Sequence, residues 1–221
     1  MDVVYQKRIG NFELVIKRDD DAPSPRDEDN VGQFWADGMH RRYNFHEEGA
    51  DDVLARIKAA EISYLGTKAD TDSWDDQDWI RYLMSVSEGR KHVYAIVPVY
   101  MYEHSGISLS CSPFSCGWDS GMVGFMICDR EHADMILGEW DYDKVVQSIV
   151  AEVEALDEYY VYGGYMYEVI EYKKCDCCGH EEEVEADTCC GFVGCPDGED
   201  GVKAQIRWEL ADEHKALIED W

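Results

Sequence analysis

The chain has 221 residues, 45% of them hydrophobic and with 14 Tyr and 7 Trp, so it can bury a sizeable core and is not intrinsically disordered. It carries 48 acidic and 20 basic residues, and the net charge of −28 is spread along the whole chain. This charge argues against nucleic acid and anionic membranes as direct partners, and it is complementary to a basic protein surface or to bulk cations.

Two features indicate the compartment. No run approaches the roughly 20 apolar residues that span a bilayer, and the beginning, MDVVYQKRIGNF, lacks the apolar region of a secretory signal. A cytoplasmic location is therefore expected. Nine cysteines in that compartment are expected to be thiols or metal ligands rather than disulfides, and an odd number cannot all pair within one chain.

The first third of the chain predicts two strands and two helices. Short strands are expected at 3–5 and 12–16, joined by a turn at Gly10-Asn11. An acidic, proline-containing loop follows at 19–30. Its carboxylates could bind Ca²⁺ or Mg²⁺, but it has no EF-hand spacing, and we interpret it as a solvated loop. Apolar residues at helical spacing then predict helices over 51–65 and 75–85.

The remainder predicts a second group of strands and helices. Apolar, β-branched and aromatic runs at 92–102 and 122–128 are typical of strands. Helices are expected at 130–137 and 143–160, and a tyrosine-rich strand at 159–172. A short strand at 202–206 and a terminal helix complete the chain.

These elements predict an α+β fold, with a mainly antiparallel central sheet flanked by three or four helices. Short glycine-containing turns between strands favour antiparallel pairing over repeated βαβ units. We expect a single domain over 1–221, with a cysteine-rich hairpin inserted at 173–200.

The cysteine-rich hairpin is the strongest motif. Six of the nine cysteines lie between Cys175 and Cys195, beginning with CDCCGH at 175–180. A C-x-x-C followed by glycine forms a tight turn in which amides face the thiolates, and structural zinc requires four N or S donors. The sequence therefore predicts a structural Zn²⁺ bound by Cys175, Cys178, Cys190 and Cys195, with His180, Cys189 and Cys177 as alternates. Reduced thiols without metal are the alternative.

The segment between the central strands is a second candidate. Cys116 with His104 and Asp119 supplies the residue types of a cysteine nucleophile, its base and an orienting acid, and Cys111 with His104 is a variant. No established nucleophile or nucleotide-binding motif accompanies them. We favour a hydrogen-bonded core loop in which Trp118 is packed and Asp119 caps a turn, and we expect a protein that is not an enzyme.

Four segments of this chain resemble an uncharacterised family of bacteriophage and prophage proteins. In chain order they are SPRDEDNVGQFWADGMHRRYNF, HSGISLSCSPFSCGWDSGMVGF, EVEALDEYYVYGGYMYEV and DTCCGFVG. The resemblance implies an accessory protein of a phage, among which anti-defence roles are common. It implies no particular activity.

Charge and resemblance together predict a non-enzymatic inhibitor or decoy, of an anti-CRISPR, anti-restriction or DNA-mimic type, for a basic nucleic-acid-handling host protein. A charge of −28 equals that of roughly 14 base pairs of duplex DNA. A Cys/His-dependent enzyme and a zinc-stapled adaptor module remain as alternatives. The expected contact residues are the densest acidic groups: Asp19, Asp20, Asp21, Asp27, Glu28, Asp29, Glu181, Glu182, Glu183 and Glu185.

Overall fold

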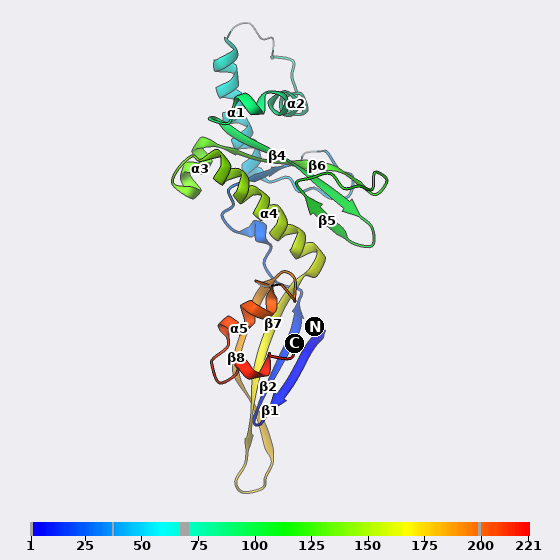
Figure 1. The fold of residues 1–221 in the computed structure, drawn as a ribbon, viewed down its shortest axis with the longest axis vertical. Coiled ribbons are helices and arrows are strands. Elements are labelled where there is room, and N and C mark those ends of the chain that lie inside the picture. Colours follow the sequence, from blue (N-terminus) through cyan, green and yellow to red (C-terminus); the bar gives the residue numbers. More distant parts are fainter. Residues whose placement is uncertain (1, 37, 67–70, 199) are drawn as a thin grey trace. The chain divides into compact units, whose positions relative to one another are not determined.

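The computed structural model describes residues 2–36, 38–66, 71–198 and 200–221, and its contacts divide the chain into two compact units (Figure 1). The first unit combines Met1–Asp27 with Glu158–Trp221, and the second is Glu28–Asp157. Each unit has its own four-stranded antiparallel sheet with helices. The α+β class is confirmed, with two antiparallel sheets in place of one central sheet. The single domain expected over 1–221 stays a prediction.

The sheet of the first unit has the order β1-β2-β7-β8. It consists of β1 (Val3–Ile9), β2 (Phe12–Asp19), β7 (Gly164–Lys174) and β8 (Glu181–Val193). The predicted β1–β2 hairpin is confirmed, and it turns at Gly10, whose φ of +63° suits a residue without a side chain. The short 3-10 helix η1 (Pro25–Asp27) follows β2 along the chain.

One face of this sheet is covered by the C-terminal segment, which contains α5 (Val202–Glu209) and the 3-10 helix η4 (Lys215–Leu217). Val202, Ile206 and Leu210 are buried there with strand residues such as Leu14 and Tyr167. The strand predicted at 202–206 is therefore wrong. The reason is visible in the sequence, because these apolar residues recur every four positions, which is a helical spacing.

The second unit has the sheet order β3-β6-β4-β5. Its strands are β3 (Gln33–Trp35), β4 (Tyr94–Glu103), β5 (Ile107–Ser110) and β6 (Ser120–Asp129). The two central strands are confirmed. The segment between them, which we expected to be a loop, contributes β5 as an additional edge strand on β4.

Helices accompany the two cores of the second unit. They are α1 (Glu48–Leu65), α2 (Asp76–Val86), α3 (Arg130–Leu137) and α4 (Tyr142–Tyr162), with the 3-10 helix η3 (Ser87–Gly89) after α2. One core joins the sheet to α4 through Val145, Ile149 and Val153. The other joins it to α1 and α2 through residues such as Leu54 and Leu83. All four helices confirm the sequence predictions.

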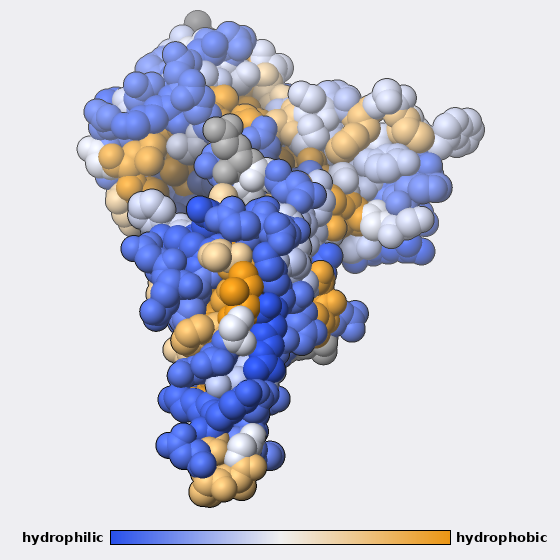
Figure 2. Space-filling model, turned by 60° about the horizontal axis from the view of Figure 1, so that its bottom comes forward, coloured by the Kyte–Doolittle hydropathy of each residue, from blue (hydrophilic) through white to orange (hydrophobic). Residues whose placement is uncertain are grey.

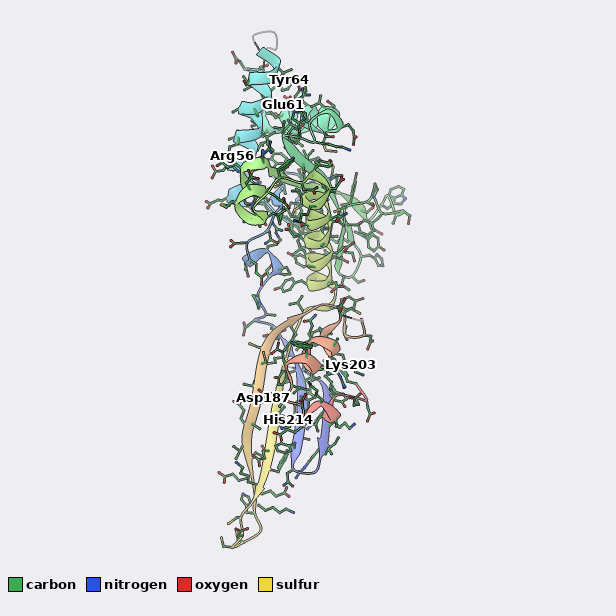
Figure 3. All side chains as sticks on the ribbon, turned by 60° about the vertical axis from the view of Figure 1, so that its left-hand side comes forward. Arg56, Glu61, Tyr64, Asp187, Lys203 and His214 are labelled. Carbon is green, nitrogen blue, oxygen red and sulfur yellow. The ribbon has the colours of Figure 1, made fainter. Side chains whose placement is uncertain are left out.

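Ion pairs fasten α1 within this unit. Arg90 Nε donates to Glu61 Oε1 at 2.5 Å, and Glu61 is only 1% exposed. The hydroxyl of Tyr82 also donates to Glu61, and the Arg90 guanidinium lies 3.8 Å from the ring centre of Tyr64. Glu61 and Tyr64 project from α1 in Figure 3. Nearer the start of the helix, Arg56 donates twice to Asp129.

The end of α4 corrects one predicted boundary. Residues 159–162 continue the helix rather than beginning the tyrosine-rich strand. The helix ends at Gly163, whose φ is +70° and whose N–H donates to the carbonyl of Tyr159, and β7 starts at the next residue.

Among the described helices, none has the length and apolar character needed to cross a bilayer.

Candidate functional site

The hairpin formed by β7 and β8 closes with a tight turn at Cys175–His180. The last paired residues of the two strands are Lys174 and Glu181. Cys175 N–H donates to His180 O at 2.8 Å, and Gly179 N–H donates to Cys175 O at 2.8 Å. Gly179 has a φ of +71°, which a side chain would oppose. The glycine of the C-x-x-C-G motif is therefore what allows the chain to reverse here.

The turn brings three thiols together. The sulfur atoms of Cys175, Cys177 and Cys178 all lie within 4.8 Å of one another, and the three residues are exposed. Cys175 Sγ and Cys177 Sγ are 2.8 Å apart. This cluster could hold a metal ion, since thiolate sulfur is the ligand preferred by zinc and by soft metals.

The hydrogen bonds of the turn favour a thiolate at Cys175. The Cys177 thiol donates to it, and so do the backbone amides of Cys177 and Cys178, which together lower the pKa of Cys175 to about 7. The same contact with Cys175, in which Cys177 is the donor, raises the pKa of Cys177. One member of the cluster is therefore substantially ionised at neutral pH, and amides face the thiolate as the motif predicted.

The four-cysteine zinc set predicted from the sequence is not assembled. Cys189 pairs with Tyr167 deep in the β7–β8 ladder, and Cys190 lies nine positions along β8 from Glu181. At about 3.3 Å per residue this separates Cys190 from the turn by roughly 30 Å, whereas a Zn–S bond is about 2.3 Å. Cys195 lies beyond the far end of the strand.

The three alternative zinc ligands differ in their position relative to the turn. Cys177, which the sequence ranked as an alternate, belongs to the cluster. His180 is in the turn, but its ring nitrogens are outside the group of atoms within 4.8 Å. Cys189 is half-buried against the core of the first unit.

Four exposed glutamates follow the turn along β8. Glu181, Glu182, Glu183 and Glu185 are all exposed. Glu181 lies 3.3 Å from Arg8 and 3.4 Å from Lys174, and the hydrogen bond from Arg8 is the main reason that its pKa is lowered. In Figure 2 hydrophilic residues cover most of this hairpin at the bottom of the view, and the orange patch at its end is the cysteine turn.

The ladder register assigns three of these carboxylates to one face. Glu181, Glu183 and Glu185 stand opposite Lys174, Tyr172 and Ile170, which alternate along β7. Because residues two apart in a strand point to the same side, the three carboxylates form a row with a repeat of about 6.8 Å. An irregularity in the register between Val169 and Ile170 ends this alternation after Glu185.

The N-terminal acidic group is less uniform than expected. Asp19 is only 8% exposed, and it accepts hydrogen bonds from the N–H groups of Asp21 and Gly191 at 3.1 and 3.0 Å. It is a buried structural acceptor, so its expected role as a contact residue is corrected. The other members, Asp20, Asp21, Asp27, Glu28 and Asp29, are exposed, and the boundary between the two units falls between Asp27 and Glu28.

The candidate catalytic residues of the central segment lie close together, but the histidine is not next to the cysteine, as a cysteine nucleophile requires. Asp119 Oδ2 is 3.7 Å from His104 Nδ1 and 3.8 Å from Cys116 Sγ. The carboxylate thus lies between the thiol and the imidazole, and the exposed His104 is not the group beside the sulfur. A nucleophile of this type needs its base within hydrogen-bond reach.

The surroundings of this segment also differ from those of an enzyme site. Trp118 is 97% exposed, so the expectation that it is packed is wrong. Cys111 faces the core, and burial raises its pKa to about 11. A polar cavity of about 380 Å³ is lined by Glu103, Asp119 and Ser120, but neither Cys116 nor His104 lines it.

An apolar pocket in the second unit was not predicted. It has a volume of about 290 Å³ and is lined by residues of several elements, among them Trp35, Ile80, Met84 and Phe125. The buried Trp35 Nε1 has no hydrogen-bond partner among the described residues. No local pattern in the sequence marks such a pocket, because its wall is assembled from β3, α2, β4 and β6.

Comparison with protein-family models, with curated proteins and with solved structures finds no match to this chain. The functional argument therefore depends on the residues themselves.

Proposed function

We propose that this protein is a non-enzymatic binding protein whose acidic β8 row occupies a basic surface on a protein that handles nucleic acid. The observation that carries the proposal is the exposed row of Glu181, Glu183 and Glu185 on one face of β8. It lies in the segment 175–200, which has nine acidic residues and neither Lys nor Arg.

Total charge alone does not select this surface. The first unit has 23 acidic and 10 basic residues, and the second has 25 and 10, so both units are acidic. The β8 row is distinguished by regular spacing. Its carboxylates repeat every ~6.8 Å along a single face, so they form a regular line of negative charge. A groove that receives phosphates is therefore a suitable partner for this row.

Such binding would make the protein a decoy that competes with nucleic acid. The resemblance to phage accessory proteins favours a host defence complex as the target, of the kind that anti-CRISPR or anti-restriction proteins block. Attraction between opposite charges would bring the partners together quickly, and salt would weaken it, because the Debye length falls from about 10 Å at 0.1 M to about 3 Å at 1 M salt.

The test is capture of partners from a lysate of the cells that contain the protein, at 0.1 and 0.5 M NaCl, with the bound proteins identified. We expect a nucleic-acid-binding protein that is retained at low salt, released at high salt and displaced by duplex DNA. The double variant Glu183→Lys/Glu185→Lys should lose it. A matched control, Asp134→Lys/Glu154→Lys, reverses two exposed acids on α3 and α4 and should retain it.

Capture of no partner at either salt would contradict the proposal. Equal loss from both double variants would mean that the charge acts through the whole surface and not through the β8 row.

We also propose that the cysteine turn binds Zn²⁺. The C-x-x-C-G turn directs two backbone amides at a thiolate, and zinc is the common partner of such thiolates in tetrahedral sites. Elemental analysis of protein purified without chelator should find zinc, and Cys175→Ser should remove it while Cys190→Ser retains it. Failure of reduced protein to take up added zinc would contradict this assignment.

A further inference from the structure

The cysteine turn offers an incomplete set of ligands for zinc. Structural zinc is bound by four donors in a tetrahedron. Of the described residues, only Cys175, Cys177 and Cys178 gather at the turn, and they are one donor short even if all three bind. The other cysteines of β8 begin at Cys189, eight positions from the first residue of the strand.

Two of the three thiols are arranged as a chelating pair. Cys175 and Cys178 are three residues apart, and the amides of Cys177 and Cys178 donate to Cys175 Sγ. Cys177 is adjacent to Cys178 and two residues from Cys175, and its sulfur lies 2.8 Å from that of Cys175. The C-x-x-C spacing of Cys175 and Cys178 is the one common to structural zinc sites, so Cys177 is not needed as a ligand.

The turn is also accessible to another molecule. The pairing of β2 with β7 ends at Phe12 and Glu171, with a further bond from Tyr172 N–H to Asn11 O, so the turn at Cys175–His180 extends beyond the end of the β1–β2 hairpin. Every residue from Cys175 to His180 is exposed. A second turn of the same kind can therefore approach without displacing the core of the unit.

We propose that one Zn²⁺ joins two copies of this chain through their hairpin turns, with Cys175 and Cys178 of each copy as its four ligands. The inference rests on the zinc assignment made above and is independent of the acidic row. A two-fold axis through the ion makes the two pairs equivalent, which is the commonest symmetry of protein dimers. Two identical pairs provide the four thiolates of a closed tetrahedral site.

The charges near the turn oppose this dimer at low salt. Four thiolates around one Zn²⁺ leave a net charge of −2, and Lys173 and Lys174, at the end of β7 directly before the turn, are already paired with Glu171 and Glu181. The overall charge of −28 on each copy also opposes association, so added salt should favour the dimer.

The experiment is a titration of the reduced, metal-free 221-residue chain with ZnCl₂, followed by sedimentation velocity. We expect the mass to double from 25.4 kDa, with saturation at one Zn²⁺ per two chains, and EDTA to reverse the change. Substitution with Co²⁺ should give the absorption of a tetrahedral four-thiolate site. The dimer should be more stable at 0.5 M than at 0.05 M NaCl. This salt dependence is opposite to the one expected for binding of the acidic β8 row to a basic partner.

Variants separate the ligands from their neighbours. Cys175→Ser and Cys178→Ser should remain monomeric with zinc, whereas Cys177→Ser and Cys190→Ser should still dimerise. Uptake of one Zn²⁺ per chain by a protein that stays monomeric would overturn the inference and leave the zinc assignment standing. Absence of zinc uptake would overturn both.

Discussion

The hairpin turn and the central segment have similar residues but different structures. Each connects two antiparallel strands and contains Cys, His, Asp and Gly. At the turn, three thiols converge within 4.8 Å on a short stretch of backbone whose amides point at one sulfur. In the central segment, Cys111 faces the core and Cys116 lies beside a carboxylate.

The difference lies in what holds each segment. The turn is closed by two backbone hydrogen bonds within six residues, so closeness in sequence becomes closeness in space. The central segment is longer and contains β5, which pairs with β4 and is bound to α4 by the hydrogen bond from Leu109 N–H to Asp157. These contacts with the rest of the unit, and not closeness in sequence, determine where Cys111 and Cys116 lie. A shared composition therefore does not indicate a shared function.

The largest expected difference concerns thiol reactivity. In metal-free protein at pH 7, Cys175 should react with iodoacetamide about 100-fold faster than Cys111. The pKa values of about 7 and about 11 favour the Cys175 thiolate by roughly 5,000-fold, and the weaker nucleophilicity of a low-pKa thiolate reduces this advantage. Mass spectrometry of the modified peptides measures both rates.

The pH dependence of these rates sharpens the comparison. The Cys175 rate should level off by about pH 9, where a thiol with a pKa of about 7 is almost fully ionised, while the Cys111 rate should keep rising towards pH 11. Cys177→Ala removes the thiol that donates to Cys175 and should slow its reaction at pH 7. Equal rates at Cys175 and Cys111 would show that the two segments do not differ in this way.

A smaller effect is expected from the contact that anchors the central segment. Asp157 Oδ1 accepts from the N–H of the buried Leu109 at 2.6 Å, which fixes β5 to α4. Asp157→Ala leaves that amide unpaired and should lower the free energy of unfolding by about 2 kcal/mol, measured by urea denaturation. Glu154→Ala, an exposed residue on the same helix, should change it by less than about 0.5 kcal/mol. Equal effects would mean that this hydrogen bond contributes little to holding β5, which is then held by its pairing with β4 and by packing.

The smallest effect is expected at the catalytic candidates. Cys116→Ala and His104→Ala should each alter the free energy of unfolding by no more than about 0.5 kcal/mol, because His104 is exposed, Cys116 is half-buried and their shared contacts with Asp119 are long. Thermal unfolding of the two variants measures this. Unchanged stability together with complete loss of partner capture in both variants would instead assign the partner contact to the central segment.

Patterns with a local cause were predictable from the sequence. The apolar face of α4 follows from a periodicity of 3.6 residues, and β4 and β6 follow from continuous apolar, β-branched and aromatic runs; those elements are where they were expected. Where the local pattern was misread, as at Val202–Glu209, the helical spacing of Val202, Ile206 and Leu210 was still present in the sequence.

The sequence by itself determined the acidic charge, most of the helices and strands, and the turn that directs amides at Cys175, because each depends on residues close together in the chain. Only the tertiary structure decided which distant residues meet. The register of β7 and β8 carries Cys190 roughly 30 Å from the turn, and the fold buries Asp19 against Gly191. Both outcomes depend on strand length and on packing between remote segments, and neither is encoded in a local pattern of residues.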